Sequence, residues 1–227
     1  MIIGYVLLGL IAVLMFFGLL NTTVKAMRID PWVALFFVIA FIVGGIIPMV
    51  SFGSEVVVGI GGFIVPFVLM IVLVVLSVIK GGGTNVVRLV ASIASITAVT
   101  TAVLTWMPTD VTWVAILSRF VIGILAGAIS YVICADRISS VTGAIGGVVW
   151  GNLAAAMIAY FFGNADAIVL GSGLVYDAII IGMVFAVVLA MVANQMRVGH
   201  NSHARANAEF ADENDTENWN KFDDHMN

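Results

Sequence analysis

The stretch "LGSGLVYDAIIIGMVFAVVLAMV", residues 170–192, decides the fold class of this protein. It is almost wholly apolar, and its length matches the roughly 20 residues with which an α-helix crosses a bilayer. One carboxylic acid, Asp177, interrupts it. An unpaired charge in the hydrocarbon region costs several kcal/mol, with estimates starting at about 2.5. The stretch therefore predicts a membrane helix whose acid has a polar partner inside the fold.

The composition of the whole chain also indicates a membrane protein. Hydrophobic residues make up 62% of the sequence and charged residues 10%, whereas a soluble domain carries roughly 25% charged residues. The single cysteine, Cys134, excludes an intramolecular disulfide. The first 20 residues lack a basic region and a small-residue cleavage site, so we expect a retained membrane span rather than a signal peptide.

Hydropathy predicts an all-α fold, a polytopic transmembrane bundle over residues 1–196. Helices are expected because backbone groups in lipid must be bonded within the segment, and the short alternating segments of a membrane barrel are absent. The seven predicted spans are 2–20, 31–50, 56–79, 87–107, 113–134, 141–162 and 169–194. Residues 197–227 are polar and acidic, which predicts a disordered tail.

The basic residues predict the orientation. Eight of the nine lie in, or flank, the connections after the first, third and fifth spans or follow the seventh span, and the charged residues of the alternate connections are all acidic. The positive-inside rule then places the N-terminus outside and the tail in the cytoplasm, in a cell membrane.

The ninth basic residue is Arg119, which lies inside the fifth span. It is about seven residues from the outer end of that span, or roughly 10 Å deep. Asp177 is about eight residues into the seventh span, or roughly 12 Å deep. The equal depths predict that the two side chains form a buried ion pair. Such a pair is either a structural brace between two helices or part of a substrate, ion or proton site.

Further polar residues are predicted near this pair. Asn152 lies in the middle of the sixth span, where it either bonds across a helix interface or lines a polar cavity, and Tyr176 precedes Asp177. The sixth span also carries small residues at four-residue spacing, which predicts close packing against another helix of the bundle or of a second copy. These helix-packing glycines are Gly143, Gly147 and Gly151.

The start of the third span is rich in residues that interrupt helices. Either this is a kinked helix, since Gly and Pro are common in membrane helices, or it is a broken helix of the kind that transporters use to expose backbone dipoles. The residues of this predicted broken helix are Gly59, Gly61, Gly62 and Pro66. The sequence "GIGG" lacks the rest of any phosphate-binding loop, so nucleotide binding is rejected.

No catalytic, cofactor or metal site is predicted. All three histidines lie in the tail, which excludes a histidine-ligated metal within the membrane. Asp177 has no second acid within the spans, as an intramembrane aspartyl protease would require. We therefore expect a protein that is not an enzyme, has no cofactor and does not bind nucleic acid.

Several stretches resemble the domain-of-unknown-function 1614 (DUF1614) family of prokaryotic multi-pass membrane proteins. They are "RIDPWVALFFVIAFIVGGIIP" (28–48), "EVVVGIGGFIVPFVLMIVLV" (55–74), "TGAIGGVVWGNLAAA" (142–156) and "LGSGLVYDAIIIG" (170–182). The resemblance implies a multi-pass fold and no established activity. Its pattern has an acid where this chain has Asn152, so it gives no support to two-carboxylate chemistry here.

Two functions follow from these features. The first is a transporter or channel for an ion or small solute, with its polar centre at Asp177, Arg119 and Asn152. The second is a membrane scaffold that acts through oligomerisation and its tail. The predicted partners are the lipid bilayer, a second copy through the glycine face of the sixth span, and a cytoplasmic protein bound by the tail.

Overall fold

The structure is a computed structural model that describes residues 2–17, 31–107, 112–134, 136–163 and 165–193. Its contacts divide the chain into two compact units, Met1–Ala190 and Met191–Asn227. The first unit holds nearly all the described residues. The tail predicted at 197–227, and the boundary predicted before it, lie outside them.

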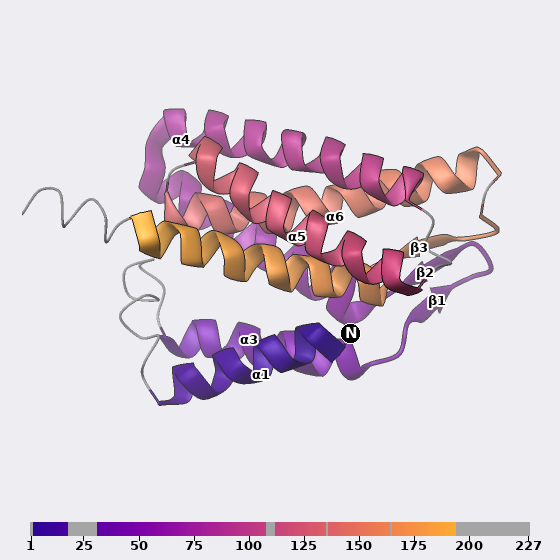
Figure 1. The fold of residues 1–227 in the computed structure, drawn as a ribbon, viewed down its shortest axis with the longest axis horizontal. Helices are drawn as coiled ribbons and strands as arrows, with labels where there is room; N and C mark the ends of the chain where they lie inside the picture. Colours follow the sequence, from indigo (N-terminus) through magenta and orange to yellow (C-terminus); the bar gives the residue numbers. More distant parts are fainter. Residues whose placement is uncertain (1, 18–30, 108–111, 135, 164, 194–227) are drawn as a thin grey trace, which may run out of the picture. The chain divides into compact units, whose positions relative to one another are not determined.

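The described part of the first unit is built mainly from helices (Figure 1). They are α1 (Ile2–Phe16), α3 (Pro31–Ile46), the π-helical turn η1 (Ile60–Ile64), α4 (Val65–Trp106), α5 (Thr112–Cys134), α6 (Arg137–Phe161) and a last helix, Gly173–Ala193. A three-stranded sheet joins β1 (Val50–Phe52), β2 (Val56–Val58) and β3 (Ile168–Leu170) in that order.

Five helical segments are long and apolar enough to cross a membrane, and they correspond to the third to seventh predicted spans. The first two predicted spans are shorter than expected in the described residues, because α1 has 15 residues and α3 has 16. Sixteen residues rise about 24 Å, less than the roughly 30 Å of a hydrocarbon core. Helix α3 ends at Ile46 because Pro48 disfavours helical backbone at the residue before it.

Helix α4 contains two membrane segments, Ile60–Ile79 with η1 and Asn85–Trp106. Met70 and Ile93, one from each segment, both lie against Gly146 of α6. In a straight helix these two residues would be about 34 Å apart, so α4 must double back between the segments (Figure 1). The reversal falls where Gly81, Gly82 and Gly83 follow one another, which is the region that the sequence predicted as a connection.

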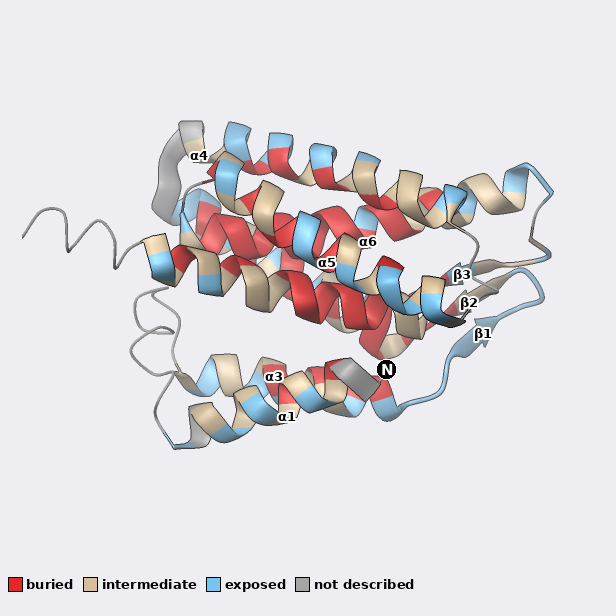
Figure 2. Ribbon diagram, in the orientation of Figure 1, coloured by how far each residue is buried: buried red, intermediate tan, exposed pale blue. Residues whose placement is uncertain are grey.

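Helix α6 is the most buried helix of the bundle, with every residue from Ile138 to Val149 inside it (Figure 2). Its glycine face lies against the second segment of α4: a Cβ atom on Gly147 would meet Ile96, and one on Gly151 would lie 2.5 Å from Cβ of Thr100. Thr97 and Thr101 of α4 donate hydrogen bonds to the carbonyls of Gly147 and Gly151. The glycine face is therefore covered by a helix of the same chain.

The small sheet is a feature that the hydropathy reading missed. Strands β2 and β3 are parallel, with Val56 opposite Ile168 and Val58 opposite Leu170. Each is followed by Gly-x-Gly and then by a helix: Gly59-Ile60-Gly61 leads to η1 and α4, and Gly171-Ser172-Gly173 leads to the last helix. Two strand–Gly-x-Gly–helix units thus lie side by side, and the Gly59 N–H donates to the Leu170 carbonyl over 2.8 Å.

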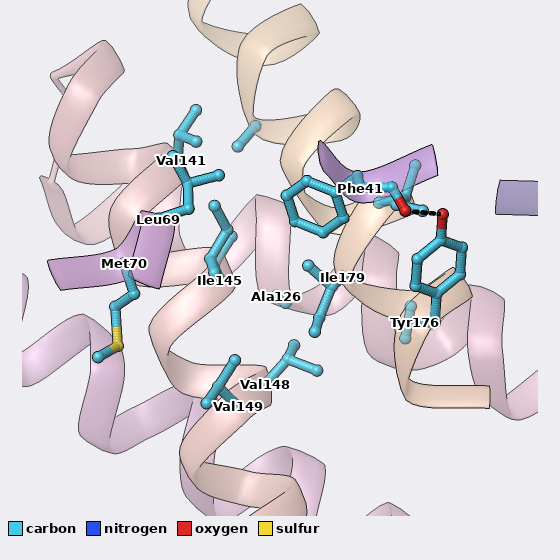
Figure 3. Packing of buried hydrophobic residues seen from close by; sticks show 14 of the residues in the cluster. Phe41, Leu69, Met70, Ala126, Val141, Ile145, Val148, Val149, Tyr176 and Ile179 are labelled. Carbon is cyan, nitrogen blue, oxygen red and sulfur yellow. Dashed lines mark hydrogen bonds between the residues drawn. The ribbon is translucent and has the colours of Figure 1, made fainter. Parts of the chain in front are cut away.

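The apolar core connects all of these helices around α6 and the last helix. Figure 3 shows Ile145, Val148 and Val149 of α6 with Ile179 of the last helix, and Phe41 of α3 near Tyr176. Phe41 and Tyr176 are both fully buried. Helix α3 is therefore fixed to the bundle next to Asp177, the residue that follows Tyr176.

Candidate functional site

The acid in the last helix is paired with the basic residue predicted inside the fifth span. Nη1 of Arg119, from α5, lies 2.8 Å from Oδ2 of Asp177. The Asp177 side chain is 0% exposed and that of Arg119 is 23% exposed. The two residues are therefore neighbours, as their equal depths predicted, and of the two the arginine is the more accessible.

The other carboxylate oxygen of Asp177 is bound by the backbone of α1. The N–H of Gly4 donates to Oδ1 over 3.0 Å. A Cβ atom at position 4 would lie 2.7 Å from that oxygen and 2.8 Å from Cδ1 of Ile180, so only glycine leaves room for this contact. A backbone donor in the first turn of a helix has no partner within the helix, and here the carboxylate satisfies it. We call Asp177, Arg119 and the Gly4 N–H the ionic centre.

Tyr176, the residue before Asp177, attaches α3 to the last helix. Its hydroxyl donates to the carbonyl of Phe41 over 2.9 Å (Figure 3). Its ring lies 5.6 Å from that of Tyr5, between centroids. Gly45 makes room for both tyrosines, because a Cβ atom there would lie 2.7 Å from the Tyr5 hydroxyl oxygen and 2.9 Å from that of Tyr176. The dipeptide Tyr176–Asp177 thus connects the last helix to α1, α3 and α5.

Asn152 has a separate role from the one predicted for it. Its Oδ1 accepts a hydrogen bond from the N–H of Gly171 over 2.9 Å, and Gly171 has a φ of +71°. Within the described residues Asn152 forms no hydrogen bond with the ion pair. It fixes the turn between β3 and the last helix, where glycine is favoured because a side chain disfavours this backbone conformation.

The glycines predicted to break the third span lie where backbones meet. A Cβ atom on Gly61 would lie 2.5 Å from the carbonyl carbon of Gly44, and Gly59 and Gly62 both lie against the Gly171 carbonyl. The span begins as strand β2, passes through the π-helical η1 and becomes α-helical at Val65, with Pro66 in the first turn of α4. Proline is tolerated there because a first-turn N–H has no helical partner.

A second polar group lies around the first turn of α6, and we call it the serine cluster. Ser92 donates to Ser130 over 3.0 Å, and Ser130 donates to the carbonyl of Ser140 over 2.6 Å. Ser77 and Ser139 share a hydrogen bond of 2.7 Å. These five serines connect both segments of α4 with α5 and α6, and all are buried. The sequence analysis did not single them out, because serine is common in membrane interfaces and carries no charge.

The chemistry available at the ionic centre is ion pairing and proton exchange. The ionic centre holds one carboxylate and one guanidinium, and the phenols of Tyr5 and Tyr176 lie beside it; these groups are not arranged as a nucleophile with a general base. In the described part of the chain, no three His, Cys, Asp or Glu side chains lie close enough to hold a metal ion. The two ligands that sequence reasoning missed, the Gly4 N–H and the Phe41 carbonyl, are backbone groups that every residue carries.

The fold and this site define a class, a helical membrane protein with an ion pair between α5 and its last helix. No protein-family model matches the chain, and neither curated proteins nor solved structures give a significant match. The resemblance to the DUF1614 family therefore stays a prediction.

Proposed function

We propose that this protein transports an ion or small solute across the membrane. We further propose that the transported ion or solute changes the contacts of the ionic centre. The observation that carries the proposal is the fully buried carboxylate of Asp177, which binds α1 and α5 at once. Ionisable residues within membrane helices are costly, and they commonly mark ion and substrate pathways.

The connections of the ionic centre support a conformational response. Neutralising Asp177 weakens its contacts with the Arg119 guanidinium and the Gly4 N–H together, since both are stronger to an ionised acceptor. The neighbouring Tyr176 holds α3 through a single hydrogen bond. One charge change thereby alters the attachment of α1 and of α5 next to the residue that holds α3, and such a change is the differential interaction that a ligand needs to shift a population between two states.

The helix beginnings near the ionic centre agree with this proposal. Many transporters bind substrates and coupling ions where helices are discontinuous and backbone groups line the site. Here η1 follows β2 and the last helix follows β3, and the two strands are paired, so the starts of these two helical segments lie side by side. Asp177 lies about one turn after Gly173, at which the last helix begins.

Flux measurements test the proposal. The full-length chain is reconstituted into phosphatidylcholine vesicles, and gradients of protons (pyranine fluorescence), rubidium ions and labelled inorganic phosphate are followed. We expect at least one gradient to dissipate at least tenfold faster than in Asp177→Asn vesicles, with Ser77→Ala, a buried polar change in the serine cluster, as the matched control. Rates equal to those of protein-free vesicles for all three probes would overturn the proposal and favour the scaffold.

A further inference from the structure

Two arginines lie at the end of the bundle opposite the small sheet, where α5 ends and α6 begins (Figure 1). Arg88 is near the start of the second segment of α4, and Arg137 is the first residue of α6. The thiol of Cys134, the last residue of α5, donates to the Arg88 carbonyl over 3.8 Å. Arg137 follows Cys134 by three residues, so their Cα atoms are at most about 11 Å apart. We call Val87, Arg88, Val90 and Arg137 the arginine patch.

The positive charge of this patch is not compensated within the described part of the chain. Arg88 is exposed and Arg137 is partly exposed, and among the described residues neither forms an ion pair with an acid. The neighbouring acid, Asp136, is the N-cap of α6. Its Oδ2 accepts from the Ser139 N–H over 3.3 Å and from the Ser139 hydroxyl over 3.2 Å. The patch therefore presents two guanidinium groups beside one carboxylate that already has two donors.

The position of Arg88 along α4 places it at a membrane surface. Trp106, at the other end of the same segment, and Trp113, at the start of α5, are both exposed. Tryptophan is enriched where the bilayer meets water. From residue 88 to residue 106 a helix rises about 27 Å, close to the roughly 30 Å of a hydrocarbon core. With Trp106 at one surface of the membrane, Arg88 lies at the level of the headgroups of the other.

Apolar side chains flank Arg88 on α4. Val87 is 69% exposed and Val90 is 60% exposed, so the described chain leaves both largely uncovered. A phospholipid presents a phosphate and, next to it, its acyl chains. It therefore matches a guanidinium with apolar side chains beside it, whereas a dissolved phosphate would make no use of the two valines.

We propose that the arginine patch binds the phosphate of an anionic phospholipid, with Arg88 and Arg137 as its ligands. The parallel N–H donors of a guanidinium match two oxygens of a phosphate, and basic groups between membrane helices bind anionic headgroups in other proteins. Phosphatidylcholine carries its own compensating cation, so it should bind more weakly. The inference goes beyond the proposed function, because it concerns a lipid that stays bound to the protein and not a transported solute.

Native mass spectrometry of the full-length chain in an uncharged detergent tests the proposal, because it resolves each bound lipid. The probes are phosphatidylglycerol and phosphatidylcholine with the same acyl chains. A basic residue near a membrane surface contributes about fivefold in affinity for an anionic lipid. We therefore expect the first phosphatidylglycerol to bind about 25-fold more tightly than the first phosphatidylcholine. Equal affinities for the two lipids would overturn the inference.

Variants that remove charge locate the site. The double variant Arg88→Gln with Arg137→Gln should lose this preference for phosphatidylglycerol. The matched control, Arg197→Gln with Arg205→Gln, removes the same charge outside the described residues and should retain the preference within about twofold. An equal loss in both double variants would mean that net charge, and not the patch, selects the lipid. Displacement of the lipid by excess inorganic phosphate would identify a site for dissolved anions and would also overturn the proposal.

Photolabelling of the wild type does not depend on how the variants fold. Phosphatidylglycerol with a diazirine near the headgroup is added at a low mole fraction to phosphatidylcholine nanodiscs, and the labelled peptides are sequenced. We expect the label to be concentrated in the first three turns of the second segment of α4 and at the end of α5. The distribution given by a phosphatidylcholine diazirine probe is the reference, and an identical distribution would refute the site. Neither measurement involves flux, so its outcome is independent of the transport proposal.

Discussion

The ionic centre and the serine cluster solve the same packing problem with different chemistry. Both join several helices through buried polar contacts, and both depend on a glycine that leaves room for them, Gly4 in one and Gly143 in the other. In the serine cluster, Ser92 and Ser130 donate to acceptors inside the bundle. In the ionic centre, Nε of Arg119 is a buried donor without a described partner.

Because of this difference, the serine cluster can only hold the helices together, whereas the ionic centre can also change its contacts. Hydroxyl groups need no charge compensation and stay neutral over the physiological pH range, so their bonds hold the helices in one arrangement. A carboxylate and a guanidinium compensate each other only while both are ionised, and the pair changes when either gains a ligand. The contrast is testable because variants at the two sites have separate expected effects on stability and flux.

Removing one charge of the ionic centre should have the largest effect. Arg119→Met removes the guanidinium that binds the fully buried Asp177 carboxylate, and we expect a loss of about 3–5 kcal/mol in the free energy of unfolding. Reversible unfolding in mixed micelles measures this loss. The double variant Arg119→Met with Asp177→Asn should be more stable than Arg119→Met alone. If the double variant were less stable, the pair would not be the source of the effect.

Filling the space beside the carboxylate should cost less. Gly4→Ala brings a Cβ atom to 2.7 Å from Oδ1 of Asp177, and relieving such overpacking costs about 1–3 kcal/mol. Gly9→Ala is the control in the same helix, because a Cβ atom at Gly9 meets nothing within 4 Å. Unfolding midpoints of the two variants check the expectation, and equal midpoints would contradict the close approach of α1 to the ionic centre.

Breaking the centre of the serine cluster should affect stability without affecting flux. Ser130→Ala removes the acceptor of Ser92 and the donor to the Ser140 carbonyl, at a cost of about 1–2 kcal/mol. Vesicle flux at a temperature well below unfolding should match the wild type. A loss of flux with an unchanged unfolding midpoint would place the responsive site in the serine cluster instead.

The smallest effect is expected at the edge of that cluster. Ser77→Ala removes one hydrogen bond, but Ser139 keeps Asp136 as an acceptor over 3.2 Å. We therefore expect a loss of about 0.5–1 kcal/mol, smaller than for Ser130→Ala in the same unfolding assay. The reverse order would mean that Ser77, not Ser130, is the main connection between α4 and the helices next to it.

The comparison also explains what the sequence could predict. The Arg119–Asp177 contact followed from depth alone, because both helices advance by the same rise per residue and charges in lipid need partners. The Gly4 N–H and the Phe41 carbonyl could not be foreseen, since a backbone group leaves no mark in the sequence. Asn152 was grouped with the pair because it is polar and lies at mid-span, but its bond to Gly171 depends on a turn that hydropathy does not show.

The helices were predictable to different degrees. The five long apolar segments gave a strong signal, and Pro48 marked the end of α3. Strands β2 and β3 were read as the starts of spans because three apolar β-branched or aliphatic residues carry no periodicity that separates strand from helix. The orientation of the chain rests on the basic residues of its connections and stays a prediction.

The parallel pairing of β2 with β3 has a consequence for how the chain assembles during synthesis. Val56–Val58 is made early, but its partner Ile168–Leu170 is made only after α4, α5 and α6. Contacts between segments so distant in sequence form late, because the entropy of closing the intervening chain must first be overcome. Until then, the Gly59 N–H lacks the Leu170 carbonyl and Asp177 is not yet present to bind α1. Insertion of the last helix is thus the step that closes the bundle, and a ribosome stalled before it would leave α1 without its contact to Asp177 and α3 without its contact to Tyr176.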